Sequence, residues 1–176
     1  MTTGHPRQHW RPRPWRPTAL LALAIALAVI VGAWGFQIIG GLAPCPLCLI
    51  ERIPYYVGIP VGAIGLAVAG TRMPAATLMA KLAMAGFLVA MLVSTGLAAY
   101  HAGVEWGFWA GPTTCTGAGA GSAGTVGDLI NQLEGATVVR CDEAPIRILG
   151  LSLAGWNVLA SLAAAGLAAR AVVRMP

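Results

Sequence analysis

The sequence predicts an all-α membrane protein, an antiparallel bundle of four transmembrane helices with two extracytoplasmic loops. Of its 176 residues, 57% are hydrophobic and only 10% are charged, whereas soluble domains carry about 25% charged residues. The mean hydropathy is +0.75, and the apolar residues gather in four long segments. This composition excludes a disordered chain, a nucleic-acid-binding protein and an ordinary cytosolic enzyme, and the length fits one small domain.

Each apolar segment is close to the ~20 residues that a helix needs to cross a hydrocarbon core ~30 Å thick. Lipid cannot satisfy open backbone groups, and no alternating strand pattern competes, so helices are expected. The expected spans cover residues 18–39, 53–70, 78–100 and 148–169, within one domain of residues 18–173. No carboxylate or histidine lies inside these spans, which argues against an ion pathway.

The first span follows residues 1–17, which are rich in Arg, Pro and Trp and are expected to form a disordered cytoplasmic tail. Its apolar run exceeds the 7–15 residues of a secretory signal peptide, which indicates an uncleaved span. In the second span, the spacing of Gly58 and Gly62 would let helices approach closely, although Gly and Ala are frequent throughout this chain.

The charges predict that both termini are cytoplasmic. Eight of the eleven basic residues flank one side of the expected bundle: Arg7, Arg11, Arg13, Arg16, Arg72, Lys81, Arg170 and Arg174. All six acidic residues and the other three arginines flank the opposite side. Basic residues concentrate in cytoplasmic segments of membrane proteins. The net charge of +5 is therefore explained by membrane orientation and requires no polyanionic partner.

Two loops are therefore expected outside the cytoplasm, a short one over residues 40–51 and a long one over residues 101–147. Within the long loop, residues 116–127 (TGAGAGSAGTVG) predict a flexible tether. Residues 128–133 (DLINQL) follow it, and their apolar side chains are compatible with a short helix at the membrane surface.

All four cysteines fall in these two loops, on the side of a bacterial-type membrane that is oxidising. Cys45 and Cys48 form a C-x-x-C motif at the entrance to the second span, where Pro46 favours a helix N-terminus. The exposed N–H groups and the helix dipole there favour a thiolate, and Arg52, one turn further, adds positive charge. These features indicate a redox-active pair, because the thiolate is the species that attacks a disulfide.

Cys115 and Cys141 form the second candidate pair, on either side of the flexible tether. Mobile sulfurs suit thiol exchange, although two inert structural disulfides remain an alternative in an oxidising compartment. No metal site is expected, since a second C-x-x-C or an H-x₃₋₅-H is missing. Four cysteines allow three pairings, so the sequence leaves the connectivity open.

The stretch from Pro44 to Arg52 (PCPLCLIER) resembles the C-x-x-C-x-x-E-R signature of the disulfide-bond formation protein B (DsbB) family. The resemblance extends to four spans, to Tyr100 and His101 at the end of the third span, and to the two further cysteines in the second outer loop.

This resemblance implies a protein-disulfide oxidoreductase that supports disulfide formation in exported proteins. Such an enzyme reoxidises a periplasmic thioredoxin-like (DsbA-like) dithiol oxidase and passes two electrons to membrane quinone, either ubiquinone or menaquinone. It implies that Cys115 forms the mixed disulfide with the partner and Cys141 resolves it. The reduced loop pair would then exchange with Cys45 and Cys48.

The resemblance also implies a quinone site at the lipid boundary. Cys48 would face the quinone, Arg52 would help to bind a ring oxygen, and His101 would lie near the same site. An arginine at the boundary avoids most of the ~2.5–3.5 kcal/mol that it costs at mid-bilayer. Glu51 is expected to pair with a neighbouring charge or to accept backbone hydrogen bonds.

The implied location is the bacterial inner membrane, with the cysteine loops in the periplasm and with lipid and quinone, but no nucleic acid, as further partners. Two alternatives remain. One is a vitamin K epoxide reductase-like thiol enzyme that acts on a different quinone or partner. The other is a non-enzymatic membrane protein with two structural disulfides.

Overall fold

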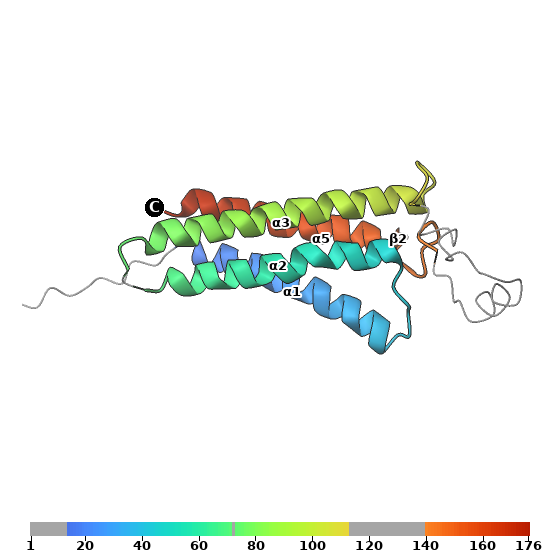
Figure 1. The fold of residues 1–176 in the computed structure, drawn as a ribbon, viewed down its shortest axis with the longest axis horizontal. Helices are drawn as coiled ribbons and strands as arrows, with labels where there is room; N and C mark the ends of the chain where they lie inside the picture. The colour runs from blue at the N-terminus through green and yellow to red at the C-terminus, as the bar shows by residue number, and fades with distance from the viewer. Residues whose placement is uncertain (1–13, 72, 113–139) are drawn as a thin grey trace, which may run out of the picture.

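The computed structural model describes residues 14–71, 73–112 and 140–176. Four helices in this part of the chain are long and apolar enough to cross a membrane: α1 (Arg16–Ile38), α2 (Pro46–Val68), α3 (Ala76–Glu105) and α5 (Leu153–Arg174). They run along one common axis, and each is antiparallel to the preceding one (Figure 1). The start of α1 and the C-terminus lie at the same end of the bundle. The predicted all-α four-helix architecture is confirmed.

Helices α2 and α3 extend further toward the loop end than the expected spans. Helix α2 begins at Pro46 rather than near residue 53, and α3 continues to Glu105 rather than ending near residue 100. Glu51, His101 and Glu105 are therefore buried within these helices. The expectation that the spans hold no carboxylate or histidine was wrong in this respect, because partners inside the bundle stabilise polar groups that hydropathy assigns to loops.

The first helix begins slightly earlier than expected. Helix α1 starts at Arg16 with Pro17 in its first turn, a position that tolerates a missing N–H. Trp15, which was assigned to the disordered tail, is only 4% exposed and belongs to the core. The tail therefore ends closer to the N-terminus than residue 17. The tether over residues 116–127 and the surface helix over residues 128–133 lie outside the described residues.

A two-stranded hairpin precedes the last helix. Strand β1 (Arg147–Ile148) pairs antiparallel with β2 (Leu151–Ser152), and the turn places Leu149 and Gly150 at positive φ (53° and 86°), as a type I′ turn requires. The Ser152 side chain then accepts a hydrogen bond from the Gly155 N–H at 3.1 Å and caps α5. For this reason the helix begins at Leu153 rather than near residue 148.

Small residues let the helices pack closely. Alanines recur on the inner faces of α1 and α5, and Gly58, Gly62 and Gly65 are buried on α2. A Cβ atom on Gly65 would lie 2.9 Å from the Ala83 Cβ of α3, and one on Gly62 would lie 3.2 Å from the Phe87 ring. The small-residue spacing of α2 is therefore a true packing feature, since only glycine allows this approach.

The outer surface of the bundle is strongly apolar. Large aliphatic side chains on all four helices are more than half exposed, for example Leu20, Val31, Ile64, Leu82, Val89, Leu162 and Val173. A soluble monomer rarely exposes so continuous an apolar surface, whereas lipid covers one without cost. The outward side chains therefore agree with a multi-pass membrane protein.

Candidate active site

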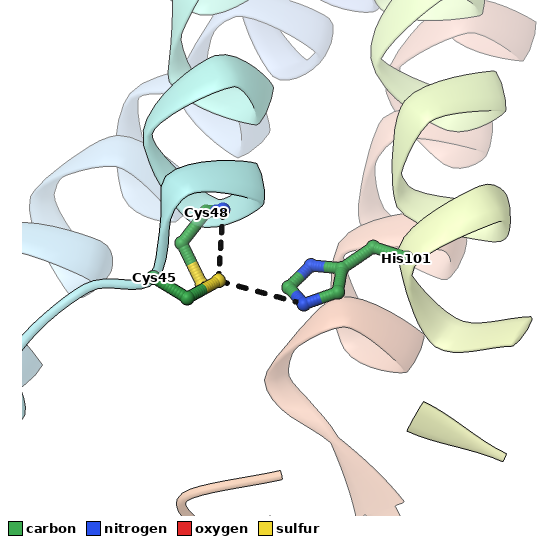
Figure 2. Close-up of side chains that lie close together, drawn as sticks. All are labelled: Cys45, Cys48 and His101. Atoms are coloured by element: carbon green, nitrogen blue, oxygen red, sulfur yellow. Dashed lines mark hydrogen bonds between the residues drawn. The ribbon is translucent and has the colours of Figure 1, made fainter. Parts of the chain in front are cut away.

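The two cysteines of the first loop meet at the N-terminus of α2 (Figure 2). Cys45 is the N-cap residue, with an extended backbone (φ −72°, ψ 165°), and its sulfur accepts a hydrogen bond from the Cys48 N–H at 3.1 Å. Pro46 fills the first helical position, where an N–H would have no intrahelical partner. The two sulfurs lie 2.7 Å apart, and both cysteines are free thiols. A disulfide between them requires only a small approach.

The surroundings of Cys45 favour its thiolate. Its pKa lies below the ordinary value, chiefly because its sulfur shares a hydrogen bond with the Cys48 thiol. Burial opposes this shift, and the Cys48 backbone N–H supports it. The position at the positive end of α2 acts in the same direction. Cys45 is thus equipped to act as a nucleophile.

A chain of buried polar side chains leads from this sulfur across three helices. The Nε2 atom of His101, on α3, lies 3.6 Å from the Cys45 sulfur, and its Nδ1 atom lies 2.5 Å from Glu51 Oε1. The other Glu51 oxygen accepts a hydrogen bond from Asn157 of α5 at 2.7 Å. The Tyr55 hydroxyl donates to the Asn157 amide oxygen at 2.5 Å. A nucleophile, an imidazole and an orienting carboxylate thus stand in the order that activates thiols in other enzymes.

The sequence pointed to some members of this chain and missed others. His101 was expected near the site, and it lies against Cys45. Glu51 was expected to pair with a neighbouring charge or to accept backbone hydrogen bonds, and its carboxylate contacts the His101 imidazole. Asn157 and Tyr55 were not anticipated. An amide within an otherwise apolar span is a signal that could have identified Asn157, because a buried amide requires partners.

Arg52 is also buried, at 8% exposure, and points toward α1. Its guanidinium group donates to the Gln37 side-chain oxygen at 2.6 Å and lies 5.4 Å from the centre of the Trp34 ring. A longer hydrogen bond of 3.5 Å reaches the Ala33 carbonyl. Contacts with α1 therefore hold the arginine that was expected beside the second sulfur, and Gln37 is a polar partner that sequence reasoning missed.

A cavity of about 320 Å³ opens beside these residues between the helices. Apolar side chains form most of its wall, including Val29, Ile30, Phe36, Leu42, Leu153 and Trp156. Cys48, Arg52 and His101 line one part of it, whereas Cys45 is not part of the wall; the further polar lining residues are Gln37, Glu51, Tyr55, Glu105 and Asn157. The cavity has the apolar walls and few polar groups that are typical of small-molecule sites.

A buried cluster borders the C-x-x-C pair. Cys45 belongs to it together with Leu47, Val104 and Cys141, which is 1% exposed, and Cys48 packs against it. Cys141 is disulfide-bonded, and its partner is neither Cys45 nor Cys48, because both of these are free. Cys115 lies outside the described residues. The disulfide-bonded Cys141 thus packs in the same small cluster as the Cys45 thiol of the first loop.

Comparison with known proteins decides the family. The model of the family described as "Disulfide bond formation protein DsbB" matches residues 15–171. The chain belongs to the DsbB family. The resemblance seen in the C-x-x-C-x-x-E-R stretch is thereby confirmed, and DsbB membership makes this protein a thiol oxidoreductase of the membrane that serves disulfide-bond formation.

Two relatives of this DsbB-family chain cover most of its length. It is 29% identical over 153 residues to "Disulfide bond formation protein B" of Dechloromonas aromatica (strain RCB), a match that covers 84% of each chain. It is 26% identical over 144 residues to "Uncharacterized protein RP370" of Rickettsia prowazekii (strain Madrid E), which covers 81% of this chain and 79% of that one. No solved structure matches it.

Proposed function

We propose that this protein reoxidises a soluble, DsbA-like dithiol oxidase and passes the two electrons to membrane quinone. One observation carries the proposal: the C-x-x-C pair at the start of α2 lies between the apolar cavity and the disulfide-bonded Cys141. Cys48 lines the cavity together with Arg52, and both cysteines contact the buried cluster that contains Cys141, to which Cys45 belongs. A pair in this position suits transfer between a loop disulfide and a lipid-soluble acceptor.

The proposed relay consists of successive thiol exchanges. The partner's thiolate attacks the loop disulfide at Cys115, and Cys141 leaves as a thiolate; the partner's second thiol then releases the partner as a disulfide. Cys141 in turn attacks the oxidised form of the first pair at Cys45, and Cys115 completes that exchange. Each exchange breaks one S–S bond, forms another and moves two electrons, which finally reside on Cys45 and Cys48 as thiols.

We assign His101 as the base that serves this pair. Its Nε2 faces the Cys45 sulfur, and the Glu51 carboxylate at Nδ1 holds the ring in that orientation and stabilises the imidazolium that forms when a thiol proton is transferred. Asn157 and Tyr55 orient Glu51 in turn. Asn157 and Tyr55 are thus positioning residues, because they act through the carboxylate.

The cavity residues fit a quinone. Val29, Phe36 and Trp156 supply apolar wall for a flat ring, and Arg52 supplies a buried cation. A quinone bound there would accept two electrons and two protons and leave as the quinol. Arg52, oriented by Gln37, would stabilise negative charge on a ring oxygen. The proposal does not choose between ubiquinone and menaquinone.

We further propose that the protein lies in a bacterial inner membrane, with both termini in the cytoplasm and the cysteine-bearing end in the periplasm. The excess of basic residues beside the ends of α1 and α5 supports this orientation. A soluble dithiol oxidase would then meet the second loop from the periplasm, where disulfides persist.

The decisive experiment measures quinone reduction by the purified protein in the presence of a reduced thioredoxin-fold dithiol oxidase. The unchanged chain is expected to consume quinone, and Cys48→Ser to lose this activity. Arg52→Ala is expected to raise the KM for quinone at least ~10-fold while exchange between the two cysteine pairs continues. No quinone reduction by the unchanged chain, or full activity of Cys48→Ser, would overturn the proposal.

A further inference from the structure

Three metal-binding atoms converge at the C-x-x-C motif. The Cys45 and Cys48 sulfurs and the Nε2 atom of His101 all lie within 4.8 Å of one another (Figure 2). Cys45 and His101 are buried, and Cys48 is half-buried. From this cluster we infer that the reduced C-x-x-C pair and His101 form a binding site for a thiophilic divalent cation such as Zn²⁺, and that oxidation of the pair abolishes the site.

The donor set and its spacing fit zinc. Zinc binds thiolate sulfur at ~2.3 Å and imidazole nitrogen at ~2.0–2.1 Å, and a tetrahedral ion therefore separates such donors by ~3.5 Å. The observed distance from the Cys45 sulfur to His101 Nε2 is 3.6 Å. The two sulfurs, now 2.7 Å apart, must separate by ~1 Å, which a small rotation of the half-buried Cys48 side chain allows.

Glu51 prepares the imidazole for this role. Its carboxylate lies 2.5 Å from His101 Nδ1, so the ring carries its proton on Nδ1 and directs the Nε2 lone pair at the sulfurs. A carboxylate behind a ligating histidine is the usual outer partner of zinc sites, where it fixes the ring and increases its basicity.

Glu105 is a second, independent observation that favours a cation at this position. One of its carboxylate oxygens lies 3.9 Å from His101 Nε2. Its other oxygen is buried and, among the described residues, has no hydrogen-bond partner. A buried carboxylate oxygen without a partner is costly, and a cation beside His101 would remove that cost. Glu105 also lines the cavity and could supply the fourth, oxygen ligand.

Binding and oxidation exclude each other on chemical grounds. Zn²⁺ would form one bond to each sulfur while the two thiols release two protons to solvent; no electrons move. A disulfide between Cys45 and Cys48 uses the same sulfurs and leaves no thiolate for the metal. The site therefore exists only in the reduced state, and an ion bound there would hold the pair reduced. The inhibition that follows rests on the proposed function, whereas the binding itself does not.

The test is a Zn²⁺ titration of the purified full chain in the presence of a chromophoric chelator, at one fixed pH, in the reduced and the oxidised state. A background variant carries Cys115→Ala, Cys141→Ala, His5→Ala and His9→Ala, which removes the other cysteines and the tail imidazoles. One Zn²⁺ per reduced chain and none per oxidised chain is expected. Co²⁺ in place of Zn²⁺ should give a sulfur-to-metal charge-transfer band in the reduced chain alone.

Ligand variants then test the geometry. Cys48→Ser and His101→Ala should each weaken Zn²⁺ binding at least ~10-fold, and Glu51→Gln by ~10–100-fold, as outer-partner substitutions do. Gln37→Ala, on the same cavity but away from the donors, should leave the affinity unchanged, and thermal unfolding of each variant checks that it is folded. Equal binding to the reduced and oxidised chains, or an affinity that His101→Ala does not change, would overturn the inference. This titration needs neither quinone nor partner. It therefore tests Zn²⁺ binding even if the protein does not reduce quinone.

Discussion

Cys45 and Cys48 are separated by only two residues, and their sulfurs share His101 and the Cys141 cluster as neighbours, but only Cys48 lines the cavity. The N-cap geometry places the Cys45 sulfur 3.6 Å from His101 Nε2, while Cys48 lies in the first turn of α2. The Cys48 N–H donates to the Cys45 sulfur, and the two thiols share a hydrogen bond; both contacts favour a thiolate at Cys45, where thiol exchange is proposed. The two cysteines of the motif therefore differ chemically because the backbone holds one as the N-cap residue and the other in the first helical turn.

The lowered pKa of Cys45 makes a pH-dependent prediction. A lowered pKa means that the thiolate persists below the pH at which an ordinary cysteine is protonated, and that it disappears as the pH falls through the lowered value. We expect alkylation of Cys45, followed by mass spectrometry of its peptide in the reduced protein, to show a midpoint below that of an ordinary thiol.

The matched control for this experiment is Cys48→Ala, which removes the thiol that shares a hydrogen bond with the Cys45 sulfur. Its alkylation midpoint should rise toward the ordinary value, whereas Gln37→Ala, on α1, should leave the midpoint in place. Identical profiles for the unchanged chain and Cys48→Ala would contradict the role assigned to this hydrogen bond.

At the scale of the element, α2 is specialised differently along its two halves. Its first turns carry the reactive cysteines, Glu51 and Arg52, and its second half carries the glycines that contact α3. The cysteines lie at the start of α2 and His101 lies on α3, so the distance between them depends on how closely these two helices pack. The glycine packing in the second half of α2 thus helps to set the distance between the cysteines and His101 at its first turn.

Substitution of the buried glycines tests this coupling. Gly65→Ala would place a Cβ atom 2.9 Å from Ala83 Cβ and 3.3 Å from the Ala80 carbonyl oxygen. Neither neighbour is a flexible side chain, so the helices themselves would have to move apart. We expect a loss of about 1–3 kcal/mol in the free energy of unfolding, as for other overpacked cores. Thermal unfolding in detergent measures it.

Gly96→Ala on α3 is the control, since a Cβ atom there has no neighbour within 4 Å among the described residues. Its unfolding temperature should stay the same or rise slightly, because alanine favours helix more than glycine does. Equal losses in Gly65→Ala and Gly96→Ala would show that helix packing at Gly65 is not as close as described.

At the scale of the whole molecule, the antiparallel bundle gathers the reactive groups at one end. Cys45, Cys48 and Cys141 meet there although the first and last are far apart in the chain, and the start of α1 and the C-terminus lie at the opposite end. In the proposed orientation, a bundle of this shape presents the C-x-x-C pair to one compartment only. The proposed exchange between Cys141 and the first pair is feasible because these three cysteines lie at the same end.

The order of the relay can be tested by trapping. Cys141→Ser leaves Cys115 without its loop partner, so the Cys115 thiolate is expected to attack the disulfide of an oxidised partner, and the resulting adduct between Cys115 and the partner's cysteine should accumulate on a non-reducing gel. The same variant with Cys115→Ser is the control and should show no adduct. An adduct that persists in this double variant, or none in Cys141→Ser, would reject the assigned order.

The sequence alone determined the class of the protein and the chemistry of its motif. Long apolar segments must cross lipid as helices because their backbone groups have no other partners, and this reasoning located all four helices. Cysteine spacing is local, so the C-x-x-C pair and its helix N-terminus also follow from neighbouring residues. The uneven distribution of basic residues along the chain likewise predicted that both termini are cytoplasmic.

Only the tertiary structure decided which distant side chains share the site. Hydropathy ended the expected third span before His101, whereas the helix continues to Glu105, because Glu51 and Asn157 stabilise polar groups inside the bundle. The cavity and the contact of Arg52 with α1 depend on how α1 packs against α2 and α5, which no local pattern encodes. A transmembrane helix can continue past a polar residue when that residue finds hydrogen-bond partners on other helices, and those partners are distant in the sequence.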